Sequence, residues 1–233
     1  MRQLIWKEWH EQSWKLAFGC IVLSAFAAIG LRTRIIPDEE MVMWVSFPAM
    51  GLLPLLAATG LIPAERSDGT LESLAALPVS MREIFIVKTI TGLTLCAVPM
   101  IVAMIVSLMI AGGREITAFT MFNIYMQSLL TAIALFAWIF AATVRLPTEA
   151  RAAMVGIGVA ICWLMVSAGC AEQERGPLLS MISPFSFVFN TNYSFVTRPA
   201  PPFLLNVLVE AVIAAALWIW ASRAVGKDVN AVG

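Results

Sequence analysis

Few side chains in this sequence have the types and spacing that a chemical site would need. Cys20, Cys96, Cys162 and Cys170 all fall within or at the end of apolar runs, at no metal-ligand spacing, which is typical of small hydrophobic residues. His10 is the only histidine, so one chain offers no histidine-based metal or haem site. We find no nucleophile–base arrangement and no Gly-x-x-x-x-Gly-Lys-Ser/Thr phosphate loop. The sequence therefore predicts a chain that is not an enzyme by itself, with no metal and no cofactor of its own.

Polar residues inside apolar segments form a second candidate site. Thr120, Asn123, Gln127 and Thr131 recur at spacings of three, four and four, which puts them along one face of a helix. Glu210 lies about seven residues into another apolar run, roughly 10 Å deep at the helical rise per residue. Polar groups are costly in lipid, so these side chains should face protein or water. They line a translocation path or bond neighbouring helices, and Glu210 alternatively pairs with a polar neighbour near the outer boundary.

The segment 63–83 has the most informative spacing. Ser67, Asp68 and Gly69 form a polar start of the kind that begins a helix. A row of leucines at three-residue spacing follows, and Pro78 ends it; the leucines are Leu71, Leu74 and Leu77. The row is too small to form a core, so it needs another surface to bury it. Ser80-Met-Arg-Glu83 then matches a capping box directly before an apolar run.

The elements that position these residues follow from the composition. Of the 233 residues, 60% are hydrophobic and 13% are charged, against about 45–50% and about 25% in soluble domains. A soluble core cannot bury this much apolar surface, whereas a bilayer can. The net charge is zero, so nothing indicates a nucleic-acid partner.

Six segments have the length of roughly 20 apolar residues that a membrane helix requires. They are 16–31, 43–62, 84–111, 119–144, 152–170 and 203–222. The sequence therefore predicts an all-α integral membrane protein with a single membrane domain over 1–233. Pro48 and Pro54 predict kinks in the second span. In the fifth span, Ala152, Gly156 and Ala160 permit close packing within the bundle or at a dimer seam.

The lysines and arginines predict the orientation. With the N-terminus in the cytoplasm, inside segments hold ten of them and outside segments hold five, as the positive-inside rule favours. The inside set is Arg2, Lys7, Lys15, Arg66, Arg82, Lys88, Arg145, Arg151, Arg223 and Lys227. Both termini are then cytoplasmic, and so are the segment 63–83 and a second short loop, 145–151.

The first 15 residues are typical of an amphipathic helix at the membrane interface. In a helical projection one side is apolar and carries Ile5, Trp6, Trp9 and Leu16. The other side is charged and carries Lys7, Glu8, Glu11 and Lys15. Tryptophan favours the headgroup layer. The segment is a plain interfacial anchor or a lever that passes motion to the first span. A cleavable signal peptide is disfavoured by its three Trp and two Glu residues.

The segment after the second span resembles the signature of the type-2 ABC exporter permeases, which have six-helix membrane subunits. The matching residues are Glu65, Gly69, Thr70, Leu71, Glu72, Leu74, Pro78, Val79, Ser80, Glu83 and Lys88. The resemblance implies that 65–80 forms a cytoplasmic coupling helix that docks into a separate ATPase. The leucines would be buried in the ATPase, while Glu65, Asp68 and Glu72 would pair with its basic residues.

The resemblance also implies the assembly. Two permease subunits, identical or homologous, would work with two copies of the ATPase, which bind ATP and Mg, in the inner (plasma) membrane. Short re-entrant helices would cap the outer end within 171–202, where Phe185-Ser-Phe-Val-Phe189 is unusually apolar for a free loop; a plain interfacial loop is the alternative.

These observations predict the permease subunit of an ATP-driven transporter, as an exporter. A haem-exporter-like biogenesis permease has the same helix count and a related loop. An ion-coupled carrier would instead show repeated halves and charged midplane residues, and we find no repeat. A membrane scaffold or signalling subunit that transports nothing is the remaining alternative.

Overall fold

The computed structural model describes residues 2–33, 36–70, 80–111, 118–172, 182–189 and 203–230, and every regular element in these ranges is a helix. In chain order these are α1 (Arg2–Thr33), α2 (Asp38–Thr59), α3 (Ile62–Ser67), α5 (Met81–Ala111), α6 (Ala118–Thr143), α7 (Glu149–Glu172), α9 (Ser186–Phe189) and α10 (Phe203–Asn230). Six helical stretches, with α2 and α3 counted as one, are long and apolar enough to cross a membrane. The predicted all-α membrane fold with six spans is confirmed.

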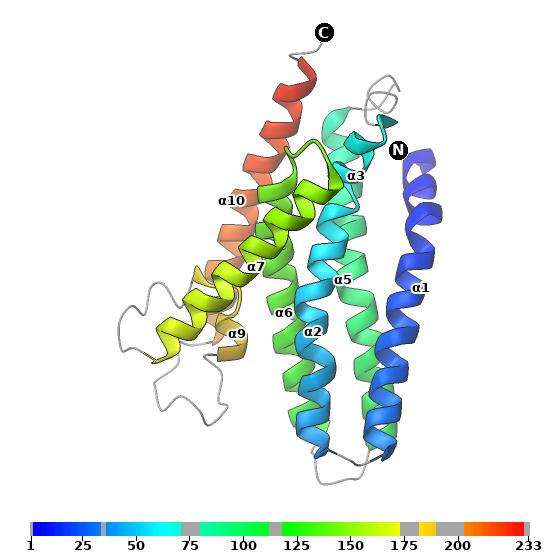
Figure 1. Cartoon of the computed structure of the whole chain (residues 1–233), viewed down its shortest axis with the longest axis vertical. Helices are drawn as coiled ribbons and strands as arrows, with labels where there is room; N and C mark the ends of the chain where they lie inside the picture. Colours follow the sequence, from blue (N-terminus) through cyan, green and yellow to red (C-terminus); the bar gives the residue numbers. More distant parts are fainter. Residues whose placement is uncertain are drawn as a thin grey trace.

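The long helices run side by side along one axis (Figure 1). α1 packs on α5 and α2 packs on α6, while α5, α7 and α10 also contact α6. α6 is the central helix, since 67% of its most apolar stretch is buried, against 11% for α1 and 17% for α10. The outward faces of α1, α7 and α10 carry large exposed apolar side chains such as Phe18, Met165 and Val212, which suits helices that face lipid.

Both chain ends lie at the same end of the bundle, at the top of Figure 1. An even number of spans requires this arrangement. α3 and the loop after α6 lie at that end too, whereas α9 lies beside the lower part of α10.

Gly156 is a position in the fifth span where no larger side chain fits against the neighbouring helices. A Cβ atom placed there would stand 2.6 Å from Cδ1 of Leu55 on α2 and 3.0 Å from Cγ2 of Ile139 on α6. Of the two predicted roles for this small-residue row, the structure shows packing within the bundle, because the glycine faces α2 and α6 of its own chain.

The apolar part of the outer segment is buried in the bundle. Phe185 and Phe187 are 4% and 2% exposed, and α9 contacts α6, α7 and α10. Ser183 and Ser167 of α7 share a buried hydrogen bond. This burial accounts for the greasy composition of the segment, while 173–181 and 190–202 lie outside the described residues.

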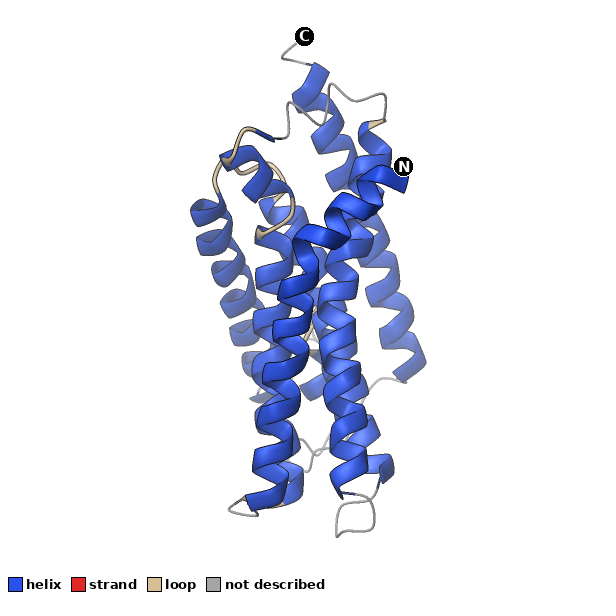
Figure 2. Ribbon diagram, turned by 90° about the vertical axis from the view of Figure 1, so that its right-hand side faces the viewer, coloured by secondary structure: helices blue, strands red, loops and turns tan. Residues whose placement is uncertain are grey.

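The N-terminal segment differs from its prediction. It is continuous with the first span in α1, and its first turns lean away from the rest of the helix in Figure 2. Leu4, Glu8 and Gln12 are buried in it, at 5%, 1% and 9% exposed, whereas Trp6 and Trp9 are 69% and 56% exposed. The predicted charged face was therefore wrong for Glu8, because that carboxylate has a buried cation on α5 to pair with.

Candidate functional site where both termini lie

α3 and the turn after it begin the predicted coupling segment. Pro63 stands in the first turn of α3, and the helix ends at Ser67 because Asp68 and Gly69 turn the chain. Gly69 has φ of 70°, a left-handed conformation that costs other residues roughly 1–2 kcal/mol. The Thr70 hydroxyl donates a hydrogen bond to the Glu65 carbonyl at 3.3 Å.

The structure leaves part of the predicted segment untested. Thr70 is helical again after the turn at Asp68 and Gly69. The remaining predicted coupling residues, Leu71, Glu72, Leu74, Leu77 and Pro78, lie outside the described residues.

A buried ion cluster joins three elements directly behind α3. Lys88 of α5 lies with its Nζ 2.8 Å from Glu8 Oε1 of α1 and 2.9 Å from Glu65 Oε1 of α3. The Lys88 and Glu8 side chains are 2% and 1% exposed. Lys7 approaches Glu65 at 3.6 Å and Glu11 at 3.7 Å. The cluster ties α1, α3 and α5 together by charge in a place where water cannot screen it.

This cluster changes the interpretation of Glu65. The sequence predicted that Glu65 pairs with basic residues of a partner protein, whereas the structure shows it 8% exposed and paired within the chain. Carboxylates of Glu8, Glu11 and Glu65 lie close enough together to hold a metal ion by distance alone. Lys88 already contacts two of them, so the arrangement is an ion-pair cluster built from the chain's own cation.

Sequence reasoning missed Glu8 and the role of Lys88. A signal was present, because Leu4, Glu8 and Gln12 recur every four residues and all three are buried. The helical projection instead put Trp6 and Trp9 on the apolar face, whereas the structure shows both side chains exposed.

The start of α5 is fixed by the predicted capping box. The Ser80 backbone N–H donates to Glu83 Oε2 at 3.0 Å, and the Glu83 backbone N–H donates to Ser80 Oγ at 3.3 Å. This confirms the prediction. One turn further, Ile84 and Val87 pack with Leu4 of α1 in a small apolar cluster. The first turns of α1 and α5 are thereby held together beside the ion cluster.

The second predicted cytoplasmic loop lies against α3. Arg66 Nη1 donates a hydrogen bond to the Arg145 carbonyl at 3.2 Å, and α3 contacts α7. The Arg145 guanidinium stands 5.3 Å from the centre of the Trp220 ring on α10, at cation–π distance. The structure thus brings together the two segments that the sequence marked separately.

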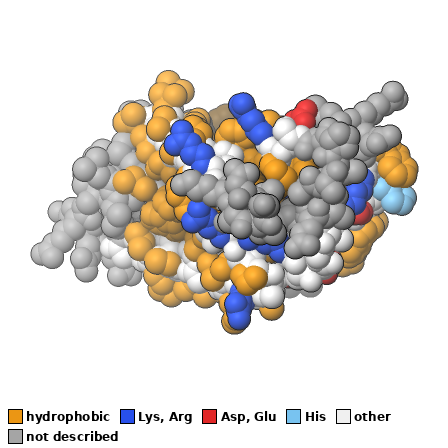
Figure 3. Space-filling model, turned by 90° about the horizontal axis from the view of Figure 1, so that it is seen from above, with side chains coloured by type: hydrophobic (Ala, Val, Ile, Leu, Met, Phe, Trp, Pro, Cys, Tyr) orange, Lys and Arg blue, Asp and Glu red, His pale blue; other side chains and the backbone are white. Residues whose placement is uncertain are grey.

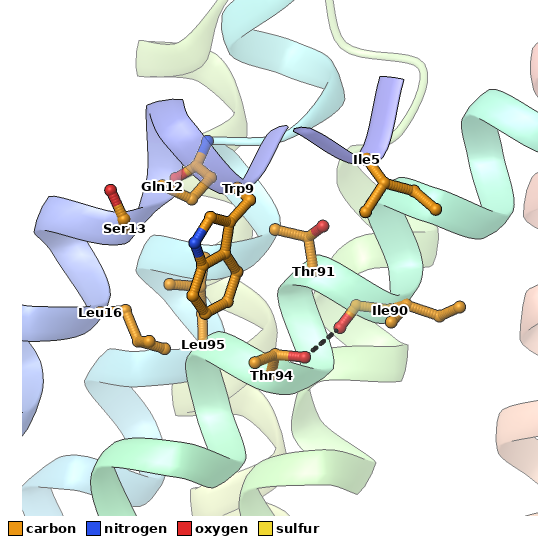
Figure 4. Close-up of a pocket in the computed structure, with 9 residues that line it drawn as sticks. All are labelled: Ile5, Trp9, Gln12, Ser13, Leu16, Ile90, Thr91, Thr94 and Leu95. Atoms are coloured by element: carbon orange, nitrogen blue, oxygen red, sulfur yellow. Dashed lines mark hydrogen bonds between the residues drawn. The ribbon is translucent and has the colours of Figure 1, made fainter. Parts of the chain in front are cut away.

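A narrow groove separates α1 from α5 next to the ion cluster. It has a volume of about 110 Å³. In Figure 4 the Trp9 ring reaches from α1 toward Leu95 of α5, with Thr91 beside it. The remaining lining residues are Ile5, Gln12, Ser13, Leu16, Ile90 and Thr94. α1 and α5 are therefore packed less tightly at this level than at the ion cluster itself.

This end of the molecule carries exposed positive charge. Figure 3 looks onto it and shows Lys and Arg side chains spread over the face. Arg82, Arg145, Arg151 and Arg223 are exposed. At the opposite end, the first turn of α2 carries Asp38, Glu39 and Glu40. The charge difference has the direction that the positive-inside rule describes.

The polar residues predicted for a translocation path are divided by the structure. Asn123 of α6 is exposed, whereas Gln127 and Thr131 are 4% and 0% exposed. Gln127 Nε2 donates to Asn123 Oδ1 at 3.2 Å. Glu210 is 4% exposed on α10, and α10 contacts α6. Gln127 and Asn123 thus bond one another within α6, and this contact supports neither a translocation path nor a bond to a neighbouring helix.

Comparison with known proteins identifies the family. A search of the curated proteins found no significant match. The family model of the ABC-2 family transporter proteins matches residues 5–167, which include the ion cluster, α3 and the capping box. Members of this family are the membrane permease subunits of ABC transporters and associate with an ABC ATPase, which supplies the catalysis. The chain belongs to the ABC-2 family of transporter proteins.

Proposed function

We propose that this chain is the permease subunit of an ATP-driven exporter, and that it is coupled to its ATPase through α3 and the segment that follows. The ion cluster at Lys88 carries this proposal, because it connects the predicted docking segment to two membrane helices. ATP and Mg bind to the ATPase. In the proposed complex two permease subunits, identical or homologous, meet two ATPases in the inner membrane, with both termini of each permease in the cytoplasm.

The route for motion starts at the docking segment. The leucines Leu71, Leu74 and Leu77 insert into the ATPase, and Asp68 and Glu72 pair with basic residues there. A displacement of this segment moves α3 and therefore Glu65. Because Glu65 is bound to Lys88, and Lys88 to Glu8, the displacement reaches α5 and α1 together. Coupling between distant sites requires a physically connected network of this kind with two discrete arrangements.

The groove beside the cluster gives α1 room to respond. Its lining is largely apolar and its side chains are incompletely packed, so α1 is able to shift against α5 at this level, while the Glu8–Lys88 hydrogen bond holds the two helices together beside it. This favours the lever function of the N-terminal segment over a plain interfacial anchor.

The docking proposal is tested by co-purification. The chain is expressed with the ATPase encoded beside it, and the ATPase captured by the tagged permease is quantified. We expect Leu71→Ser with Leu74→Ser to lower capture at least tenfold, because two apolar anchors of an interface are lost. Glu72→Gln should weaken capture less, and Glu39→Gln, an acidic residue at the opposite end, should leave it unchanged.

The transmission step needs a separate readout. In proteoliposomes, Lys88→Met should retain ATPase capture but lose ATP-dependent flux, because the docking surface remains while its connection to α1 and α5 is cut. Full capture by the double leucine variant contradicts the docking proposal. Normal flux in Lys88→Met contradicts transmission through the ion cluster.

A further inference from the structure

Two polar side chains of α10 are buried with polar atoms that no described residue bonds. Asn206 and Glu210 are 1% and 4% exposed. Within the described part of the chain, Glu210 Oε1 and both polar atoms of the Asn206 side chain make no hydrogen bond. Buried polar groups in native proteins are nearly always bonded, so each exception requires an explanation.

The two side chains lie one above the other. They are four residues apart, and therefore on one face of α10. The same face carries Ala221 and Ala224 further along, both buried in the main core. An asparagine amide one turn from a carboxylate is able to donate to it and satisfy both groups, but the Asn206 Nδ2 donates to nothing among the described residues. These polar atoms of both side chains are therefore buried and unbonded by the described residues.

Charge restricts what this pair would bind. The ion pairs of the described residues that involve a buried carboxylate are those of Glu8 and Glu65 with Lys88 and Lys7, and all lie at the other end of the bundle. A carboxylate in a low-dielectric interior is strongly destabilised unless a cation or a proton neutralises it. A ligand that carries positive charge would remove this penalty.

We propose that Asn206 and Glu210 bind the ammonium group of a cationic amphipathic cargo molecule inside the permease. The inference rests on the proposed transport function and adds the class of substrate. An ammonium group has three N–H donors, which match the acceptors of Glu210 and the Asn206 carbonyl oxygen. Phe187 of α9 and Phe185, just before α9, are both buried. Because α9 contacts α10, it offers an apolar surface for the apolar part of the cargo molecule.

Access to this pair requires a change in the bundle. Both side chains are enclosed in the arrangement described, so the cargo reaches them only in a second arrangement. Alternation between two arrangements is what ATP-driven transport requires in any case. Short α9 lies beside the first turns of α10 (Figure 1) and contacts that helix.

The test uses two probes that share one alkyl chain and one fluorophore, of which only one is charged. One is a fluorescent alkyl primary amine, and the other is the same molecule with its amine acetylated. Binding is measured by fluorescence anisotropy on the purified complex with its ATPase, and ATP-dependent flux is measured in proteoliposomes. We expect the amine to bind and to be transported, and the acetylated probe to bind at least tenfold more weakly.

Variants assign the effect to the two side chains. Glu210→Gln keeps the shape and removes the charge, so it should weaken amine binding by about tenfold or more and leave the acetylated probe unaffected. Asn206→Leu should weaken amine binding less. If Glu210→Gln does not fold, the loss of amine binding in Asn206→Leu is the result that tests the proposal. Glu149→Gln, an exposed acidic residue in the first turn of α7, is the matched control and should bind both probes as the unaltered protein does.

Three outcomes would overturn the inference. The first is equal binding of the two probes. The second is unaltered amine binding in Glu210→Gln, which would make Glu210 a protonated structural acid. The third is a requirement for sodium in place of the amine. Failure of the ATPase to co-purify would count against the proposed function instead, and probe binding is then measured on the purified permease alone.

Discussion

Lys88 is the buried cation that pairs with two carboxylates, those of Glu8 and Glu65. Its ammonium contacts two carboxylates, and all three groups are shielded from water. Removing one member of a buried ion pair typically costs about 3–5 kcal/mol, because the remaining charge stays buried without compensation. The same cluster is therefore a stability element as well as the proposed connection to the ATPase.

We expect Lys88→Met to lower the free energy of unfolding by about 3–5 kcal/mol, as followed by thermal unfolding in detergent. The double variant with Glu8→Gln should lose less than the sum of the two single losses, because both substitutions remove the same Glu8–Lys88 pair and the double variant leaves no Glu8 carboxylate unpaired. Lys7→Met is the control, since the Lys7 side chain is 37% exposed and exposed pairs contribute about 1 kcal/mol or less. Equal losses for Lys88→Met and Lys7→Met would show that the buried pairs do not stabilise the fold.

At the scale of single elements, the glycines of α7 give the sharpest contrast. A Cβ atom built at Gly156 would stand closer than van der Waals contact to Leu55 of α2 and Ile139 of α6, whereas nothing lies within 4 Å of a Cβ atom built at Gly158. The two positions share one helix and nearly the same depth, so they separate packing from helix propensity.

Gly156→Leu should lower the free energy of unfolding by about 1–3 kcal/mol, since the added side chain overpacks the contact with Leu55 and Ile139. Gly158→Leu should change it by about 0.5 kcal/mol or less in either direction. Thermal unfolding of the purified variants measures both. If Gly158→Leu were the more damaging change, the face of α7 that packs on α2 and α6 would be the other one.

The elements also show where sequence reasoning succeeded. The spans and the capping box at Ser80 were predictable because hydrophobic length and cap spacing are local properties. Glu8 and Lys88 were not recognised as partners because 80 residues separate them, and a pairing over that distance depends on how helices pack. Arg66 and Arg145 approach one another for the same reason, through a contact between α3 and the loop after α6 that no periodicity reveals.

For the whole molecule, the orientation in the membrane determines whether the coupling proposal is feasible. α3, the loop after α6 and both termini lie at one end. Exposed Arg82, Arg145, Arg151 and Arg223 lie there, whereas exposed Arg32 stands in the last turn of α1 at the other end. Glu39 and Glu40 are exposed at the other end. A docking segment for a cytoplasmic ATPase has to lie on the first of these ends.

Cysteine labelling checks this orientation. Ser67→Cys and Glu39→Cys both replace exposed residues, and a membrane-impermeant maleimide is applied to intact cells. We expect Glu39→Cys to react at once and Ser67→Cys to react only after the membrane is permeabilised. The unaltered protein is the control for its native cysteines. Labelling of Ser67→Cys in intact cells would place α3 outside and contradict the proposed coupling.

The continuity of α1 from Arg2 onward has a practical consequence for anyone who expresses this protein. Leu4 and Glu8 are buried within the first turns of the helix, so an affinity tag or fluorescent domain fused to the first residue would be anchored beside them. The last turns of α10 extend past the neighbouring helices (Figure 1). A tag fused at the carboxyl end is therefore attached away from the packed helices, so this end is the better one for an affinity tag.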